Sequence, residues 1–380
     1  MRKVSIDLLT PEMKLGKSIY CEGFLLLRYG TSNLQRYVNK FEELDISSIY
    51  VDDSISDGIE IHDAISDKTR KKCKDALTDT FKQLKGNKKL ELDKIYDAAT
   101  TMIDEIMNQP NIIVSLHDIG SSKDETLLHS VSTAVYGLVL ANRMGLGKVS
   151  QRDLAQGLLL HDIGKILLNQ AILYKDSSLT REEFEHIKLH TGMGYEILKK
   201  NPLLTEASRR VALEHHERLD GSGYSGVSGS EISMAVRIAG IVDIYDALTV
   251  NRCYRKGFTP SKAAEILTKE AASKLDAKLC ANFFQCIAIY PNGTMVKLSN
   301  GRLAVVKEQN HGVPFHPVIR LIDRYNGKII PGKEVDLSKT LNITIVEDDP
   351  EVLSQLLAEK PTQLNPLKPG VTIGRVGMAV

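Results

Sequence analysis

The sequence has 380 residues, a length typical of two or three domains. Apolar residues make up 42% of it and charged residues 26%, as in ordinary soluble globular proteins. Because 49 lysines and arginines face 48 aspartates and glutamates, the formal net charge is only +1, which gives no reason to expect binding to DNA or to a membrane.

The cysteines and the first residues indicate a cellular compartment. No two of the five cysteines form a C-x-x-C pair, so we expect reduced thiols, with Cys280 and Cys286 in the core. The first residues lack the apolar segment of a signal peptide, and no run approaches the roughly 20 apolar residues that span a bilayer. The sequence therefore predicts a soluble, cytoplasmic protein.

Residues 1–65 are predicted to form a small α+β module. The apolar runs at 24–30 and 48–52 are typical of strands, and a short helix is expected at 33–44. Residues 66–110 show apolar side chains at helical spacing, interrupted near Gly86. They predict two connecting helices, which serve either as a plain linker or as a dimer contact.

Residues 111–290 are predicted to form an all-α bundle. A capping box at Ser150 and Asp153 predicts a helix over 154–160, and a second box at Thr180 and Glu183 predicts one over 184–198. Further helices are expected at 233–248 and 261–274.

Residues 291–346 are predicted to form a small β module. Strand-like runs lie at 295–298, 303–306 and 318–322, and Asn-Gly turn signals stand at 300–301 and 326–327. Residues 347–380 read as a loose tail. The expected fold is thus multi-domain, with a central helical bundle between a small N-terminal α+β module and a small C-terminal β module.

Histidines and acidic residues are concentrated in the bundle. Seven of the 10 histidines fall between His117 and His216. His129 follows Glu125 by four residues, so both side chains lie on one helical face. His161-Asp162 ends the apolar run 157–160, where an unpaired charge is costly. Any one such histidine is more often a core or surface residue than a ligand.

Taken together, these residues predict a metal cluster. Imidazoles supply directional bonds, and carboxylates bridge two ions and neutralise them. Nitrogen and oxygen ligands without cysteine favour iron or manganese over zinc or nickel. The predicted two-metal ligand set is His129, His161, Asp162, His190, His215, His216 and Asp243, with Glu125 as a candidate ligand for a third ion.

Three motifs carry a family resemblance. The segment His161-Asp162-Ile163-Gly164-Lys165 resembles the signature of the HD phosphohydrolase superfamily. Residues 215–224, which read HHERLDGSGY, resemble the second signature of its HD-GYP subfamily, and residues 237–255 resemble the third block. The three blocks stand in the family's order and cover about residues 111–290.

The resemblance implies a cyclic di-GMP phosphodiesterase that opens its substrate to pGpG and, with a third metal, cuts on to GMP. It implies that the residues listed above bind two or three divalent ions. Asp162 and Lys165 are then the catalytic residues. Gly223 and Tyr224 are candidate substrate contacts, although Tyr224 either lines a guanine pocket or only packs its loop. Arg252 matches a phosphate-contacting arginine, and Arg255 stands where the family has a lysine.

One departure concerns the loop that carries the second signature. The family's proline after Gly-Tyr is replaced by Ser225, which predicts a more mobile loop and leaves substrate selection open. Two other functions are therefore kept as alternatives. One is a catalytically weak cyclic-dinucleotide receptor, and the other is a hydrolase for another nucleotide such as 3′,3′-cGAMP. A homodimer and signalling protein partners are compatible with the terminal modules.

Overall fold

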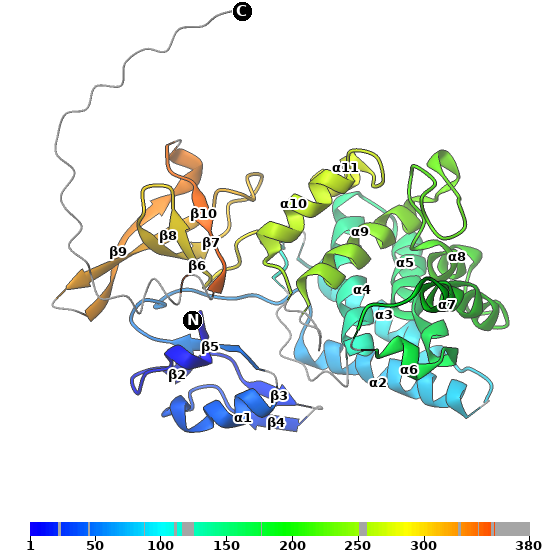
Figure 1. The fold of residues 1–380 in the computed structure, drawn as a ribbon, viewed down its shortest axis with the longest axis horizontal. Helices are drawn as coiled ribbons and strands as arrows, with labels where there is room; N and C mark the ends of the chain where they lie inside the picture. Colours follow the sequence, from blue (N-terminus) through cyan, green and yellow to red (C-terminus); the bar gives the residue numbers. More distant parts are fainter. Residues whose placement is uncertain are drawn as a thin grey trace, which may run out of the picture.

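The computed structural model describes residues 1–21, 24–44, 46–86, 88–109, 112–115, 125–175, 177–250, 257–325, 328–340, 342–350 and 353. A helical domain occupies one end of the molecule, and two small β-rich modules lie together at the other end (Figure 1). This layout confirms the predicted multi-domain fold.

The N-terminal module is built on a three-stranded antiparallel sheet in the order β1-β5-β2, and a hairpin of β3 and β4 lies beside it. Val4 pairs with Ile49 in this sheet, and both side chains are buried. The predicted strands and short helix are confirmed. The elements are β1 (Arg2–Ser5), η1 (Ile6–Leu8), β2 (Lys14–Leu15), β3 (Ile19–Cys21), β4 (Phe24–Leu27), η2 (Leu34–Tyr37), α1 (Val38–Glu43) and β5 (Ser48–Asp52).

Two helices stand between this module and the bundle in the sequence. They are α2 (Asp67–Lys85) and α3 (Asp93–Met107), and the Ser66 hydroxyl caps α2 by accepting the N–H of Thr69. Both helices bury an apolar face in the same core as the bundle, with Leu77 and Met102 fully covered. They are therefore integral to the helical domain rather than a free spacer.

The remaining helices of the bundle run from α4 to α11. Gly137 of α4 faces Leu158 of α5 so closely that a Cβ there would lie 2.3 Å from Leu158 Cδ1. Glycine at this position lets the two helices cross in close contact. The elements are α4 (Glu125–Arg143), α5 (Lys148–Leu160), η4 (Ile163–Leu167), α6 (Gln170–Leu173), α7 (Arg181–Lys199), α8 (Glu206–Glu214), η5 (Gly229–Glu231), α9 (Met234–Thr249), α10 (Pro260–Glu270) and α11 (Ala277–Phe284).

The helix starts show where local sequence signals succeed and fail. The capping box of Thr180 and Glu183 is present, and Ser233 caps α9. The box predicted at Ser150 is wrong, because α5 begins at Lys148, after Gly147 as its N-cap. Gly145, at φ 73°, ends α4, and the chain re-enters a helix so soon that Ser150 lies inside the first turn.

The last helices agree with prediction to within a few residues. Helix α10 starts at Pro260, one residue before the predicted start, because the Thr259 hydroxyl caps it. It ends at Glu270 rather than at 274, and residues 271–274 form turns. Cys280 and Cys286 are buried, as expected.

The C-terminal module is a five-stranded antiparallel sheet in the order β10-β6-β7-β8-β9. The three predicted strands are confirmed, whereas the second Asn-Gly signal lies outside the described residues. The elements are β6 (Met295–Leu298), β7 (Leu303–Glu308), β8 (Val318–Tyr325), β9 (Lys328–Asp336), η6 (Leu337–Lys339) and β10 (Ile345–Glu347).

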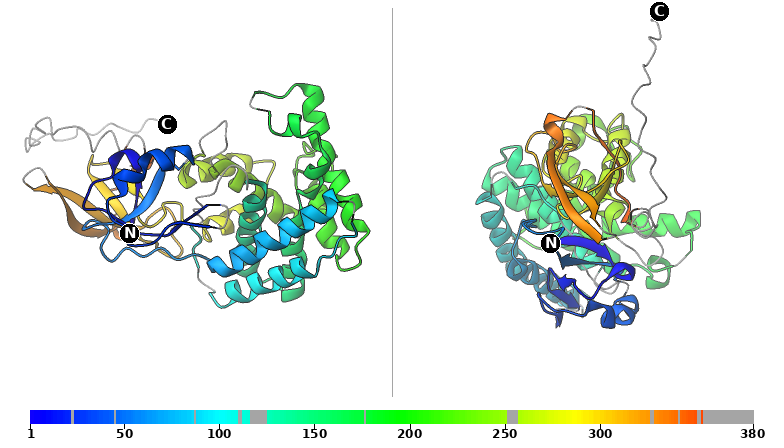
Figure 2. Two further views of the ribbon diagram at one scale, coloured as in Figure 1. Left: turned by 90° about the horizontal axis from the view of Figure 1, so that it is seen from below. Right: turned by 90° about the vertical axis from the view of Figure 1, so that its left-hand side faces the viewer.

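The two terminal modules pack against each other, although they lie far apart in the sequence (Figure 2). Arg320 of β8 donates hydrogen bonds of 2.8 and 2.6 Å to the carbonyl oxygens of Ile55 and Asp57. Val305 of β7 is buried against Ile55 and Ile59. Among the described segments, no helix combines the length and apolar character that a bilayer span requires.

Candidate metal centre

Five parts of the helical domain converge on one buried cluster of histidines and aspartates. His129 comes from α4, His161 and Asp162 follow α5, and His190 comes from α7. His215 and His216 follow α8, and Asp243 comes from α9. The turn after α5 approaches α7 closely. A Cβ on Gly164 would lie 2.0 Å from the carbonyl oxygen of His190, so only glycine allows this approach.

The first half of the cluster consists of His129, His161 and Asp243. The Nε2 atoms of His129 and His161 are 3.2 Å apart. His129 Nε2 also lies 3.2 Å from Asp243 Oδ1, and His161 Nε2 lies 4.0 Å from the same oxygen. The three side chains thus offer ligand atoms that all lie within 4.8 Å of one another.

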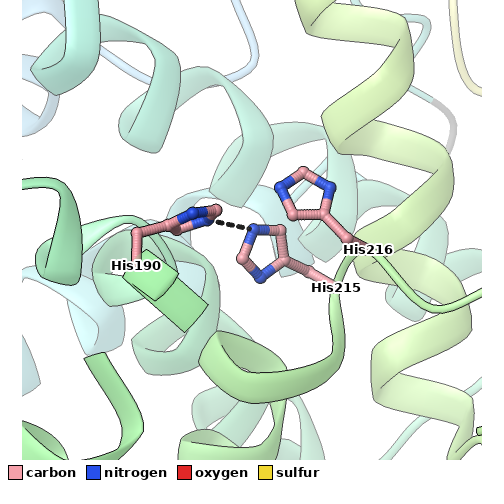
Figure 3. Close-up of side chains that lie close together, drawn as sticks. All are labelled: His190, His215 and His216. Atoms are coloured by element: carbon pink, nitrogen blue, oxygen red, sulfur yellow. Dashed lines mark hydrogen bonds between the residues drawn. The ribbon is translucent and has the colours of Figure 1, made fainter. Parts of the chain in front are cut away.

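The second half consists of His190, His215 and His216. The imidazole of His190 points toward His215, and His216 lies beside it on the same segment (Figure 3). The Nε2 atoms of His190 and His215 are 3.4 Å apart. Ligand atoms of all three side chains lie within 4.8 Å of one another.

Asp162 lies between the two halves. Its Oδ2 is 3.4 Å from His161 Nε2, and its Oδ1 is 3.4 Å from His190 Nε2 and 3.8 Å from His215 Nε2. Lys165 forms an ion pair with Oδ2 and keeps part of its side chain exposed to solvent. One carboxylate therefore faces both halves, which is the geometry of a bridging ligand.

Hydrogen bonds on the far side of the rings orient the imidazoles. The Nδ1 atoms of His161 and His190 lie 2.7 Å from the carbonyl oxygens of Leu158 and Ile187. His215 Nδ1 lies 3.1 Å from the carbonyl oxygen of Ala212. Each Nδ1–H donates to its carbonyl, so each Nε2 presents a lone pair to the centre.

His129 is oriented by a carboxylate instead. Its Nδ1–H donates to Asp246 Oδ2 at 2.6 Å, and both residues are buried. The contact joins positions 117 residues apart, so no local pattern revealed it.

The protonation equilibria of the second half favour free imidazole lone pairs. Burial lowers the pKa of His216 to about 3 and the pKa of His215 well below its usual value. Burial also lowers the pKa of His190. Neutral imidazole is the form that binds a metal.

The first half differs in its charge. Burial disfavours the charged form of His129, but its hydrogen bonds to Asp243 and Asp246 outweigh this and raise its pKa to about 10. Burial likewise opposes ionisation of Asp162 and Asp243. Neighbouring Lys165 and His161 nevertheless hold the pKa of Asp162 well below its usual value, and His129 and His216 do so for Asp243. Both carboxylates are therefore ionised.

These residues fit divalent ions. Asp162 Oδ1 is buried and has no hydrogen-bond partner among the residues that the structure describes, although it faces two histidine nitrogens that also present lone pairs. A buried carboxylate oxygen of this kind is costly unless a cation or donor compensates it. Nitrogen and carboxylate ligands around a shared aspartate are a suitable donor set for a pair of divalent ions.

A glycine-rich loop borders the cluster. The Tyr224 ring lies 4.4 Å from the His216 ring, measured between centroids. Glu217, only 4% exposed, accepts the backbone N–H groups of Ser225 at 2.7 Å and Val227 at 3.0 Å. Two hydrogen bonds thus hold the loop that was predicted to be mobile. A proline at position 225 could not donate the first of them, because proline has no backbone N–H. Sequence reasoning missed this role of Glu217.

Several predicted residues cannot be placed in the cluster. Arg252 and Arg255 lie outside the described residues, and so does the side chain of Glu125, which starts α4. A cavity of about 520 Å³ lies elsewhere, where Glu60, His62, Ser115 and His311 line the junction of the modules.

Comparison with known families agrees with this geometry. Residues 110–279 match the family described as HD domain, and residues 295–352 match the KOW domain associated with HD domain. A helical domain with converging histidines and aspartates of this kind is an HD-type domain, the class that contains metal-dependent phosphohydrolases. Residues 110–279 are therefore an HD domain, and they contain the HHERLDGSGY segment, which resembles the HD-GYP signature.

Three curated relatives indicate the range of the family. The cyclic di-GMP phosphodiesterase PA4108 of Pseudomonas aeruginosa is 30% identical over 270 residues, which cover 70% of this chain and 65% of that protein. The cyclic di-GMP phosphodiesterase PdeB of Borreliella burgdorferi is 32% identical over 55% of each chain. The 3′3′-cGAMP-specific phosphodiesterase 3 of Vibrio cholerae is 36% identical over 43% of this chain and 36% of its own. The chain spans less than two thirds of each of these relatives.

Proposed function

We propose that the protein is a metal-dependent phosphodiesterase that hydrolyses cyclic di-GMP to pGpG and on to GMP, and so lowers this second messenger in bacterial signalling. The observation that carries the proposal is Asp162. Its carboxylate faces both groups of histidines, and its Oδ1 lacks a hydrogen-bond partner within the described part of the chain. The names of two relatives, which are cyclic di-GMP phosphodiesterases, support the same substrate.

In this proposal the cluster holds two divalent ions, iron or manganese. One ion would take His129, His161 and Asp243, the other would take His190, His215 and His216, and Asp162 would bridge them. Glu125 is the proposed ligand of a third ion. Such ions supply Lewis-acid stabilisation of the phosphate and make a water molecule more acidic.

The chain's own residues hold and orient the substrate phosphate. Lys165 projects from the turn after Asp162 and remains partly exposed, so its ammonium group can approach a phosphate oxygen. Arg252 and Arg255 are proposed as further phosphate contacts, and their charges would stabilise the transition state as negative charge grows. Gly223 and Tyr224 are proposed as further substrate contacts, since the Tyr224 ring lies 4.4 Å from the His216 ring between centroids.

The test is hydrolysis of cyclic di-GMP by anaerobically purified protein reloaded with iron(II) or manganese(II). The double variant His161→Ala, Asp162→Ala serves as the control. We expect turnover in the parent protein and none in the variant, because the variant lacks a ligand of the first half and the bridge. Absence of turnover from protein with measured bound metal would contradict the proposal and favour a receptor. The ratio of pGpG to GMP reports on the third ion.

A second candidate substrate is 3′,3′-cGAMP. It is favoured by the 36% identity to a phosphodiesterase specific for that nucleotide. The same assay with both nucleotides at equal concentrations decides between them, since the preferred substrate has the higher kcat/KM.

A further inference from the structure

An aromatic corner extends the metal cluster toward the surface of α7. The Tyr224 ring stands between His216, at 4.4 Å, and Phe184 of α7, at 6.1 Å between centroids. The rings of Phe184 and Tyr224 stand at 88° to each other. Two perpendicular rings form a corner in which a flat molecule can stack on one ring and meet the edge of the other.

A lysine ammonium lies over both rings. Lys188 Nζ is 5.0 Å from the Phe184 centroid and 5.5 Å from the Tyr224 centroid. It also pairs with Glu185 at 2.8 Å, but that carboxylate side chain is 59% exposed. Exposed ion pairs of this type contribute little, so Lys188 remains available to a ligand.

Phe184 leaves much of its ring exposed. Its side chain is 43% exposed, one helical turn from the capped start of α7. Tyr224, by contrast, is fixed through its loop, because Glu217 accepts the N–H of the next residue. An exposed ring and a cation are thus held beside a positioned tyrosine, close to the predicted ligands of the second half.

We propose that Phe184, Lys188 and Tyr224 form a recognition corner for one guanine base of a cyclic dinucleotide, an inference that rests on the function proposed above. Aromatic side chains stack on any nucleic-acid base. The Lys188 ammonium donates to the O6 and N7 acceptors of guanine, whereas adenine presents an amino group in place of O6. The rings therefore supply affinity, and Lys188 supplies the preference for guanine over adenine.

The test compares Phe184→Leu and Lys188→Met in full-length, metal-loaded protein. Binding of bisphosphorothioate cyclic di-GMP and of its di-AMP counterpart is measured by calorimetry, and the KM for cyclic di-GMP is measured in parallel. We expect Phe184→Leu to weaken both nucleotides about tenfold and Phe184→Tyr to restore them. We expect Lys188→Met to weaken the guanine nucleotide about tenfold more than the adenine nucleotide.

The same helix offers matched controls. Lys199 lies 5.7 Å from the Tyr195 centroid, which repeats the lysine–aromatic pair away from the cluster, and Leu189 is an exposed apolar side chain. Lys199→Met and Leu189→Ala should leave both affinities unchanged. If the parent protein binds the analogue and Phe184→Leu binds it equally well, the corner is overturned while the proposed function stands. Equal weakening of both nucleotides by Lys188→Met overturns the assignment to guanine. A parent protein that neither binds nor hydrolyses any cyclic dinucleotide contradicts the proposed function itself.

Discussion

The two halves of the histidine cluster differ in the charged and polar groups that surround their imidazoles. His129 in the first half lies between Asp243 and Asp246, whose contacts raise its pKa to about 10. The second half consists of three imidazoles. Backbone carbonyl oxygens orient His190 and His215, and the pKa of His216 is lowered to about 3. The first half carries its own carboxylate, whereas the second half receives negative charge from Asp162 and from Asp243, whose Oδ2 lies 3.6 Å from His216 Nδ1. We therefore expect the halves to respond differently to mutation and to pH.

The largest effect is expected where the halves meet. Asp162→Asn removes the charge that both halves share, so we expect loss of bound metal from both and a fall in turnover of roughly a thousandfold or more. Metal content per chain and hydrolysis of cyclic di-GMP are the measurements, with circular dichroism to verify folding. Retention of both ions would show that Asp162 is not a bridge.

A smaller effect should separate the halves. His216→Ala removes a ligand from the second half only, and the first half keeps His129, His161 and Asp243. We expect one ion per chain to be lost, one to be kept, and turnover to fall about a hundredfold. Metal analysis at several protein concentrations measures this result. Simultaneous loss of both ions would mean that the halves bind cooperatively.

A third test uses pH on metal-free protein. As pH falls from 6.5 toward 3, the imidazoles of the second half take up protons in the unfolded chain before they do so in the folded chain, where their pKa is lowered. The free energy of unfolding therefore falls over this range. His129, with a raised pKa, contributes stability below pH 6.5 that is lost as pH rises toward 10. The free energy of unfolding, measured with urea and plotted against pH, should therefore fall on both sides of pH 6.5, with an acid limb below it and an alkaline limb above it.

One substitution for each limb makes this test specific. Asp246→Asn lowers the pKa of His129 and should flatten the alkaline limb only, because it removes a charge that faces the first half. His216→Asn should flatten the acid limb only. Equal flattening of both limbs by either variant would contradict the assignment of one limb to each half.

The smallest effect concerns the loop beside the second half. Ser225→Pro removes the N–H that donates to Glu217, a partly buried hydrogen bond to a carboxylate. We expect the KM to rise about three- to tenfold with little change in kcat, because Tyr224 loses its fixed position. Ser225→Ala keeps the N–H and is the control. A Pro variant with the KM of the parent protein would exclude this role of the loop.

Much of the fold and the site could be predicted, because the signals are local. Helix α7 is predicted by its capping box, and the strands of the C-terminal module by short apolar runs with turns between them. The histidines and aspartates were found because their motifs place charged groups directly after or within apolar runs. The start of α5 was missed, because α5 follows the local turn at Gly145 so closely that Ser150 lies within its first turn.

By itself, the sequence determined which elements form, which residues are the candidate ligands, and which family they resemble, since each of these depends on short segments. Only the tertiary structure decided that Asp162 faces both halves, that Asp246 holds His129, and that Glu217 fastens the loop. The physical reason is distance along the chain. These contacts join helices and turns far apart in sequence, so their partners are chosen by packing and not by periodicity or propensity. The same holds for Phe184 and Tyr224, whose rings meet only because α7 lies against the loop that follows α8.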